Sequence, residues 1–183
     1  MHGVPDTSGL WDLVLAQLAR DDVVALQLPG FGAPVPDGFS CTKEAYADWV
    51  ADQANALGEP VDLVGHDWGS MLVQRIATIH PKLVRTYTLC DGAVSGPLQW
   101  HDLAQQWQTP EVGEQVMEMM TPEVVEPVMR DAGHPDPVGC ARSVDDRMKQ
   151  AILKLYRSAI DVGTEWDPGE RPRATRADLV GSR

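Results

Sequence analysis

The chain has 183 residues, enough for one domain with its own core, and 43% of them are hydrophobic, as is usual for a soluble globular protein. Its formal net charge of −12 repels phosphate backbones and anionic lipid, which argues against nucleic acid and membrane partners. No apolar stretch approaches the ~20 residues that span a bilayer, and residues 1–25 lack the pattern of a secretory signal.

The three cysteines are widely spaced and form no metal-type or redox-type pair. The pattern predicts reduced thiols in a cytoplasmic protein. The histidines show no ligand spacing either, so we expect neither a metal nor a cofactor.

Hydrophobic periodicity and turn residues predict alternating helices and strands in the first half of the chain. In chain order, we expect a helix at 10–20 with Ser8 as its N-cap, a buried strand at 22–28, a helix at 42–57 that ends at Gly58, a short strand at 60–64, a buried helix at 71–79 and a strand at 83–90. Strands that alternate with helices imply parallel strands with crossover helices, which is a three-layer α/β architecture.

The pattern changes after Ala93. Three or four helical segments, broken by prolines, are expected between about residues 98 and 165, with no strand. A helical insertion that follows a strand and lies over the sheet edge is a cap. We therefore predict a partial core at 1–92, a helical cap at 93–166 and a tail at 167–183 that is disordered or foreign to the fold.

The strongest motif is Gly65-His66-Asp67-Trp68-Gly69, which lies between an expected strand and an apolar helix. This arrangement is typical of a nucleophile elbow, a strained turn that exposes a reactive side chain. Glycines two residues before and after the central position relieve backbone crowding, and the helix N-terminus favours negative charge. Asp67 holds the central position. The alternative interpretation is an aspartate that only caps the helix.

Two motifs precede the elbow: HGVP at residues 2–5 and PGFG at residues 29–32. Together and in this order, the three motifs resemble those of epoxide hydrolases and haloalkane dehalogenases, over about residues 2–166. The resemblance implies a three-layer α/β-hydrolase fold with a mostly parallel sheet and a helical cap. It also implies a sequence truncated at both ends, because the family has strands ahead of the HGVP loop and two more after the cap.

The resemblance implies a two-step displacement. The Asp67 carboxylate attacks an sp³ carbon and forms an alkyl-enzyme ester, which water activated by a histidine then hydrolyses. The backbone N–H groups of Val4 and Trp68 are the expected donors to the oxyanion that develops on Asp67. The Trp68 indole is a further candidate donor to a halide or an oxygen, and its alternative role is core packing.

Asp91 and Tyr156 are the other candidate site residues. Asp91 ends the strand after the elbow helix, at the carboxyl edge where sites in open α/β sheets lie, so it is the expected acid of a triad. It would equally suit a plain turn. Tyr156 resembles the cap tyrosine with which epoxide hydrolases donate to the opening ring, and its alternative role is packing within the cap.

Each specific reaction departs from its family pattern. Epoxide hydrolases usually have a second cap tyrosine, which this chain lacks. Many dehalogenases have a halide-binding asparagine where Val4 stands, and others use a cap tryptophan, for which Trp100, Trp107 and Trp166 are candidates. We expect an epoxide hydrolase-like enzyme that acts on a small apolar substrate, with haloalkane dehalogenase as the alternative.

The catalytic histidine of the family has no counterpart among the five histidines. A non-catalytic ligand-binding protein or an inactive fragment is therefore a third hypothesis. A sheet that lacks strands on both sides exposes its edges, so a homo-oligomer paired through those edges is also expected.

Overall fold

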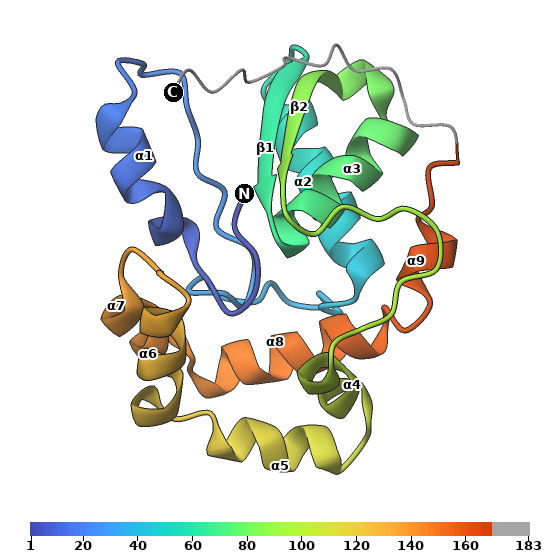
Figure 1. The fold of residues 1–183 in the computed structure, drawn as a ribbon. Coiled ribbons are helices and arrows are strands. Elements are labelled where there is room, and N and C mark those ends of the chain that lie inside the picture. Colours follow the sequence, from blue (N-terminus) through green and yellow to red (C-terminus); the bar gives the residue numbers. More distant parts are fainter. Residues whose placement is uncertain (170–183) are drawn as a thin grey trace, which may run out of the picture.

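The computed structural model describes residues 1–169, in which two parallel strands carry helices along one side and beyond one end (Figure 1). Strand β1 (Val61–His66) pairs with β2 (Val84–Cys90), and His66 lies opposite Cys90 in the register. Helix α3 (Trp68–Ile79) connects the strands and packs on both, while α2 (Lys43–Ala56) packs on α3. The α/β class with parallel strands is confirmed, with only part of the expected sheet formed in the described residues.

The remaining helices flank this unit. They are η1 (Ser8–Trp11), α1 (Asp12–Gln17), η2 (Pro81–Leu83), α4 (Asp102–Gln108), α5 (Val112–Met119), α6 (Pro122–Asp131), α7 (Pro137–Ser143), α8 (Asp146–Arg157) and α9 (Val162–Glu165).

Local sequence explains α2 and α3. The Thr42 side chain accepts from the Ala45 amide and starts α2, and Gly58 adopts a φ of +76° just after its end, as predicted. In α3, nine of the 12 residues are buried, as its apolar sequence indicates. Burial on all sides places α3 at the centre of the core.

The strand expected at 22–28 is not formed. Val23 and Val24 are 41% and 65% exposed, and the nearest pairing is an isolated bridge between Pro29 and Ala33. A strand needs a neighbouring backbone, and here Met1 lies along β1: its nitrogen donates to Val64 O at 2.6 Å, and its carbonyl accepts from the His66 amide at 3.1 Å. The apolar run has no edge to join and remains irregular.

The first helix also differs from its prediction. A 3₁₀ turn leads into α1, which ends at Gln17 rather than Arg20. Thr7 caps the 3₁₀ turn, with its hydroxyl accepting from the Gly9 amide at 3.3 Å. The Ser8 hydroxyl, expected to be the cap, instead donates to Gln27. Because apolar residues of α1 remain exposed, packing adds little to extend this short helix.

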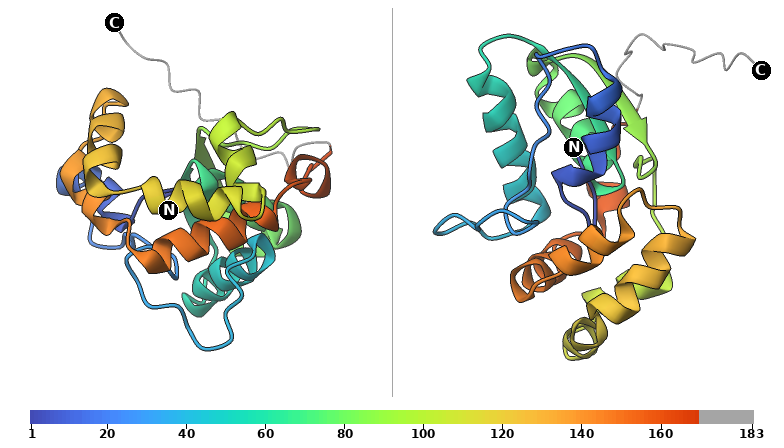
Figure 2. Two further views of the ribbon diagram at one scale, coloured as in Figure 1. Left: turned by 90° about the horizontal axis from the view of Figure 1, so that it is seen from below. Right: turned by 90° about the vertical axis from the view of Figure 1, so that its left-hand side faces the viewer.

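Between β2 and residue 169, where the description ends, the chain forms six helices rather than the three or four expected; we call α4–α9 the helical region. Pro127 lies inside α6 without ending it, because a helix can lose one N–H donor and continue. The helical region lies beyond the carboxyl ends of β1 and β2, with α8 beneath them in Figure 1 and α5 and α8 foremost in the view from below in Figure 2.

One continuous hydrophobic cluster joins the helical region to the α2–α3 core. The proposed boundary at residue 93 stays a prediction, and most of the predicted tail lies outside the described residues. Within residues 1–169, no helix combines the length and apolar character that a membrane crossing requires.

Candidate active site

Asp67 occupies the turn between β1 and α3 in a strained conformation. Its φ of 52° and ψ of −123° lie outside the regions that side-chain-bearing residues usually adopt. The Asp67 side chain makes no capping hydrogen bond to α3, so the simple N-cap alternative is not supported. Such strain persists only where surrounding contacts hold it in place.

Glycines allow three chain segments to meet at this turn. A Cβ on Gly65 would overlap the Gly69 carbonyl, and one on Gly69 would lie 2.5 Å from Met1 O. A Cβ on Gly3 would overlap the Asp67 carboxylate, and one on Gly92 would overlap the Asp67 carbonyl. Gly65 and Gly69 therefore relieve backbone crowding around Asp67, as the motif predicts. Gly3 and Gly92, from other segments, do the same.

The HGVP loop presents a donor to the carboxylate. The Val4 N–H donates to Asp67 Oδ1 at 2.7 Å. His2 braces this loop: its Nε2 accepts from the Leu28 amide at 3.2 Å, so its Nδ1 donates to Gly3 O at 2.9 Å. Burial lowers the pKa of His2 to about 4, which keeps the ring neutral and both hydrogen bonds intact at neutral pH.

Opposing effects set the charge on Asp67. Burial raises the pKa of its carboxyl, and the negative charge of Asp91 raises it further. The backbone amides of Trp68 and Val4 lower that pKa, as does His66. Asp67 as a whole residue is partly exposed, while its carboxyl group is largely buried. The carboxyl group is therefore desolvated and retains two amide donors.

Asp91 lies at the elbow, directly after β2. The Asp67 amide donates to Cys90 O at 3.1 Å, which sets the end of β2 against the turn. The Asp91 side chain is exposed, with Oδ1 accepting from the Gly92 amide at 2.9 Å. The structure brings Asp91 beside Asp67, and its role as a triad acid stays a prediction.

Tyr156 packs among three tryptophans on the side of the helical region that faces the elbow. Its ring centroid lies 5.5 Å from that of Trp68, 5.1 Å from Trp100 and 4.8 Å from Trp107. Burial raises the pKa of Tyr156, and the charge of Asp67 raises it further, so the phenol keeps its proton. Tyr156 therefore offers a hydrogen-bond donor near the residue that follows the elbow aspartate.

The candidate tryptophans differ in what their indole N–H groups contact. Trp100 donates to Ala159 O at 3.0 Å. The buried N–H group of Trp107 meets no partner with hydrogen-bond geometry in the described part of the chain, and that of Trp68 lies beside the Tyr156 phenol without reaching such geometry. Trp166 lies elsewhere, with the Arg75 guanidinium 5.4 Å from its ring centroid. Buried donors without partners are uncommon and suit a ligand acceptor.

Two buried polar residues of α3 were not recognised from sequence. The Ser70 hydroxyl donates to Gly65 O at 2.8 Å and accepts from the Cys90 amide at 3.1 Å, which joins both strands to the helix. The Gln74 side-chain amide donates to Val94 O at 2.6 Å and accepts from the Val94 N–H at 2.8 Å. These two bonds fix the chain as it leaves β2. Polar residues within an otherwise apolar helix were the available signal.

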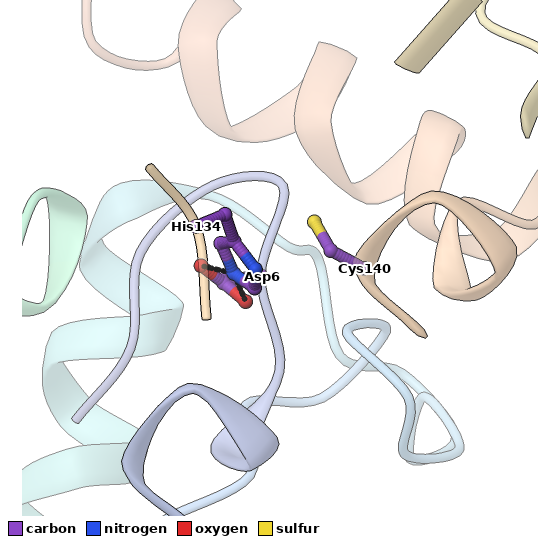
Figure 3. Close-up of side chains that lie close together, drawn as sticks. All are labelled: Asp6, His134 and Cys140. Atoms are coloured by element: carbon purple, nitrogen blue, oxygen red, sulfur yellow. Dashed lines mark hydrogen bonds and ion pairs between the residues drawn. The ribbon is translucent and has the colours of Figure 1, made fainter. Parts of the chain in front are cut away.

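A second cluster lies beside the HGVP loop. Asp6, His134 and Cys140 converge there from three separate segments, and Figure 3 shows Asp6 facing the imidazole and the sulfur pointing toward the pair. Their potential ligand atoms all lie within 4.8 Å of one another. The separation of these residues along the chain explains why spacing gave no hint of the cluster.

Comparison with known proteins identifies the family. Residues 1–180 match the sequence profile described as the alpha/beta hydrolase family. The chain belongs to the alpha/beta hydrolase family. This confirms the resemblance that the HGVP, PGFG and elbow motifs indicated.

The sequence relatives are distant. The (E)-2-((N-methylformamido)methylene)succinate hydrolase of Acinetobacter baylyi is 24% identical over 94 residues, 50% of this chain and 36% of that protein. The bifunctional epoxide hydrolase 2 of Rattus norvegicus is 30% identical over 89 residues, 46% of this chain and 16% of that protein.

Solved structures share the fold. Haloalkane dehalogenase DbeA from Bradyrhizobium elkani superposes with a TM-score of 0.67 at 22% identity, covering 91% of this chain and 62% of that one. MGS-M2, an alpha/beta hydrolase from a deep-sea metagenome library, gives 0.63 at 13% identity, covering 88% and 62%. The chain therefore spans less than two thirds of the length of these structures.

Crowding at the elbow predicts a large effect of Gly92→Ala. Gly92 and Gly38 have φ values of +72° and +77°, but nothing lies within 4 Å of a Cβ built on Gly38. We expect Gly38→Ala to cost roughly 1–2 kcal/mol of unfolding free energy through its left-handed backbone alone. Gly92→Ala should cost about 1–3 kcal/mol more, because the Asp67 backbone must shift. Denaturant unfolding of both variants measures this, and equal losses would contradict the crowding at Asp67.

The charge of Asp91 predicts a pKa shift at Asp67. Because the Asp91 carboxylate raises the pKa of Asp67, Asp91→Asn should lower it and move the titration to lower pH. Carboxyl ¹³C NMR titration of the two proteins measures the shift. Asp37→Asn is the matched control, since Asp37 is exposed and its charge is not among those that act on Asp67. If Asp91→Asn leaves the Asp67 pKa unchanged, the charge of Asp91 does not act on Asp67 and Asp91 does not belong to the site.

Proposed function

We propose that this chain is a hydrolase whose nucleophile is the Asp67 carboxylate, with epoxide hydrolase-like chemistry on a small apolar substrate. The observation that carries the proposal is the strained Asp67 turn, whose carboxylate accepts from the Val4 N–H. A side chain held in a strained turn at a strand end is the geometry of a nucleophile elbow.

The first step forms the alkyl-enzyme ester. One Asp67 oxygen attacks an epoxide carbon, the ring C–O bond breaks, and its electron pair goes to the ring oxygen. The protonated phenol of Tyr156 donates to that oxygen as negative charge develops there. The helical region acts as a cap in this proposal, since α8 supplies the phenol and α4 supplies Trp107.

The second step needs a base that activates water. His2 is committed to the HGVP loop, His134 contacts Asp6, and the His101 side chain accepts from the Ala104 amide at the start of α4. His80 is exposed at the end of α3. His66, the fifth histidine, belongs to β1 itself, directly before Asp67 and opposite Cys90 in the register. We propose that none of the five serves as the base, so the ester should persist once formed in this chain. The same observation supports ligand binding without turnover as the alternative from another class.

Haloalkane dehalogenation is the second candidate activity. The unpartnered N–H groups of Trp68 and Trp107 favour it, because a halide leaving a carbon needs hydrogen-bond donors in a water-poor site. The structural likeness to DbeA agrees with this candidate, and the partial match to the rat epoxide hydrolase agrees with the first. The proposal includes a cytoplasmic location, which three free cysteines support, and self-association through the outer edge of β2, because Met1 lies along the outer edge of β1.

Asp67 should become alkylated. All proteins in this experiment carry Cys90→Ser, because the exposed thiol of Cys90 would itself react with the reagents. We expect one covalent adduct per chain after incubation with styrene oxide or 1-bromohexane, detected by intact-protein mass spectrometry and mapped to Asp67 by peptide analysis. Asp67→Asn removes the nucleophilic oxygen while keeping a residue that tolerates positive φ, and should abolish the adduct. Asp37→Asn is the control that leaves alkylation unchanged. An adduct that persists in Asp67→Asn would reject Asp67 as the nucleophile.

Two substitutions should separate the candidate reactions. Tyr156→Phe removes the donor to an epoxide oxygen and should slow alkylation by the epoxide by about 10²-fold or more, with a smaller effect on the bromoalkane. Trp107→Phe removes an indole N–H and should slow the bromoalkane selectively, by about tenfold. Pre-steady-state rates with both reagents give the comparison. Sensitivity to Trp107→Phe alone, with Tyr156→Phe silent for both reagents, would replace the epoxide assignment with dehalogenation.

A further inference from the structure

The sequence around His134 fixes its position at the end of α6. Gly133 adopts a φ of +76°, the Gly133 amide donates to Arg130 O at 3.0 Å, and the His134 amide donates to Met129 O at 2.9 Å. This pair of bonds is a Schellman motif, in which glycine takes the left-handed position after the helix. Asp136 then caps α7 by accepting from the Gly139 amide at 2.9 Å. Two helix ends thus leave His134 little freedom.

The hydrogen bonds of His134 define its tautomer. The Asp136 amide donates to Nδ1 at 3.0 Å, so Nδ1 carries no proton and the neutral ring is protonated at Nε2. Nε2 lies 3.1 Å from both carboxylate oxygens of Asp6. The Asp6 side chain is 10% exposed, and its carboxylate also accepts from the Thr7 amide at 3.2 Å. A buried carboxylate that depends on few donors loses much when one is removed.

Cys140 contacts the same loop one residue earlier. Its Sγ lies 3.7 Å from Pro5 O, as a weak donor, and it is 5% exposed. Burial raises the pKa of the Cys140 thiol to about 12, so the thiol is protonated at neutral pH and unreactive. Residues of the α6–α7 segment therefore hold Pro5 of the HGVP loop and Asp6, the residue that follows it.

The cluster contains metal-binding side chains, but its hydrogen bonds suit a different role. A cation at Nε2 would displace the proton that now contacts Asp6 and would require a proton on Nδ1. The Asp136 N–H already points at Nδ1, so two donors would then face each other. It would also need a thiolate from Cys140, which burial opposes.

We propose that His134 is a positioning residue: the His134–Asp6 hydrogen bond, with Cys140 against Pro5, fastens the helical region to the loop that presents the Val4 N–H to Asp67. The link to chemistry rests on the proposed function. The Asp6 amide donates to Gly3 O at 3.1 Å, which closes a turn around Val4. A displacement of Asp6 therefore moves Val4, whose N–H is 2.7 Å from Asp67 Oδ1. The position of the helical region and the alignment of the donor are thereby coupled.

Cysteine labelling tests this fastening without any chemistry at Asp67. The full chain is treated with N-ethylmaleimide, and the rate at each cysteine is read by peptide mass mapping. Exposed Cys90 should react quickly, and buried Cys41 and Cys140 slowly. His134→Ala should raise the Cys140 rate by about tenfold while leaving Cys41 unchanged. His134→Gln keeps a donor near the Nε2 position and should remain closer to the parent rate. His80→Ala, at an exposed histidine, is the matched control.

Each result supports or overturns the inference. A Cys140 rate unchanged in His134→Ala, or raised together with that of Cys41 by general unfolding, would overturn it. So would stoichiometric Zn²⁺ binding that protects Cys140 and is lost in His134→Ala, since the cluster would then be a metal centre.

The link to Val4 has a separate readout. Among variants that fold, the rate of Asp67 alkylation should fall in His134→Ala and recover in His134→Gln. If the parent is never alkylated but Cys140 responds as expected, the fastening stands and the proposed function fails. Alkylation that is normal in His134→Ala would overturn the positioning role alone.

Discussion

Close approach of three backbone segments at Asp67 is the constraint on which the rest of the structure depends. Gly3 contributes the loop from the chain's beginning, Gly65 and Gly69 the turn itself, and Gly92 the exit from β2. Because each segment packs where a Cβ would stand, none can shift without disturbing the others. The strained φ of Asp67 follows from this packing, since an isolated turn would relax to an ordinary conformation. Close packing thus fixes the carboxylate in direction before any substrate arrives.

Ionisation of the buried Asp67 carboxyl lowers the free energy of unfolding. Its pKa is raised in the folded chain, chiefly by burial, so folding favours the protonated form. Stability is therefore lost as pH rises from the ordinary aspartate pKa through the folded value, where the buried group must ionise. The amides of Val4 and Trp68 limit this loss because they donate to the ionised form. Under the proposed function, the ionised Asp67 carboxylate is the form that attacks carbon, and the same two amides then hold the oxyanion.

How far the sequence predicts this structure depends on whether the deciding contacts are local. The elbow, α2, α3 and β2 follow from residues that are neighbours in the chain, and all were predicted to within a few residues. The strand expected at 22–28 failed because a strand exists only through its partner, and the free edge of β1 is occupied by Met1. His134 was missed for the same reason. Its local turn is encoded by Gly133, but its partner Asp6 lies 128 positions away and leaves no periodic signal.

The site divides into two layers that come from different parts of the fold. The proposed nucleophile and its amide donors belong to the HGVP loop and the β1–α3 turn, where the donors to Asp67 are backbone N–H groups. The groups that would distinguish an oxygen from a halide as the leaving atom are side chains, and Tyr156 and Trp107 come from α8 and α4. Under the proposed function, specificity therefore resides in the helical region, because backbone donors accept many substrates whereas placed side chains do not. Changes in α4 or α8 can then alter the substrate without disturbing the elbow, provided that the helical region stays aligned with the HGVP loop. The hydrogen bond between His134 and Asp6 can provide this alignment, because it joins the helical region to the chain directly beside the Val4 donor.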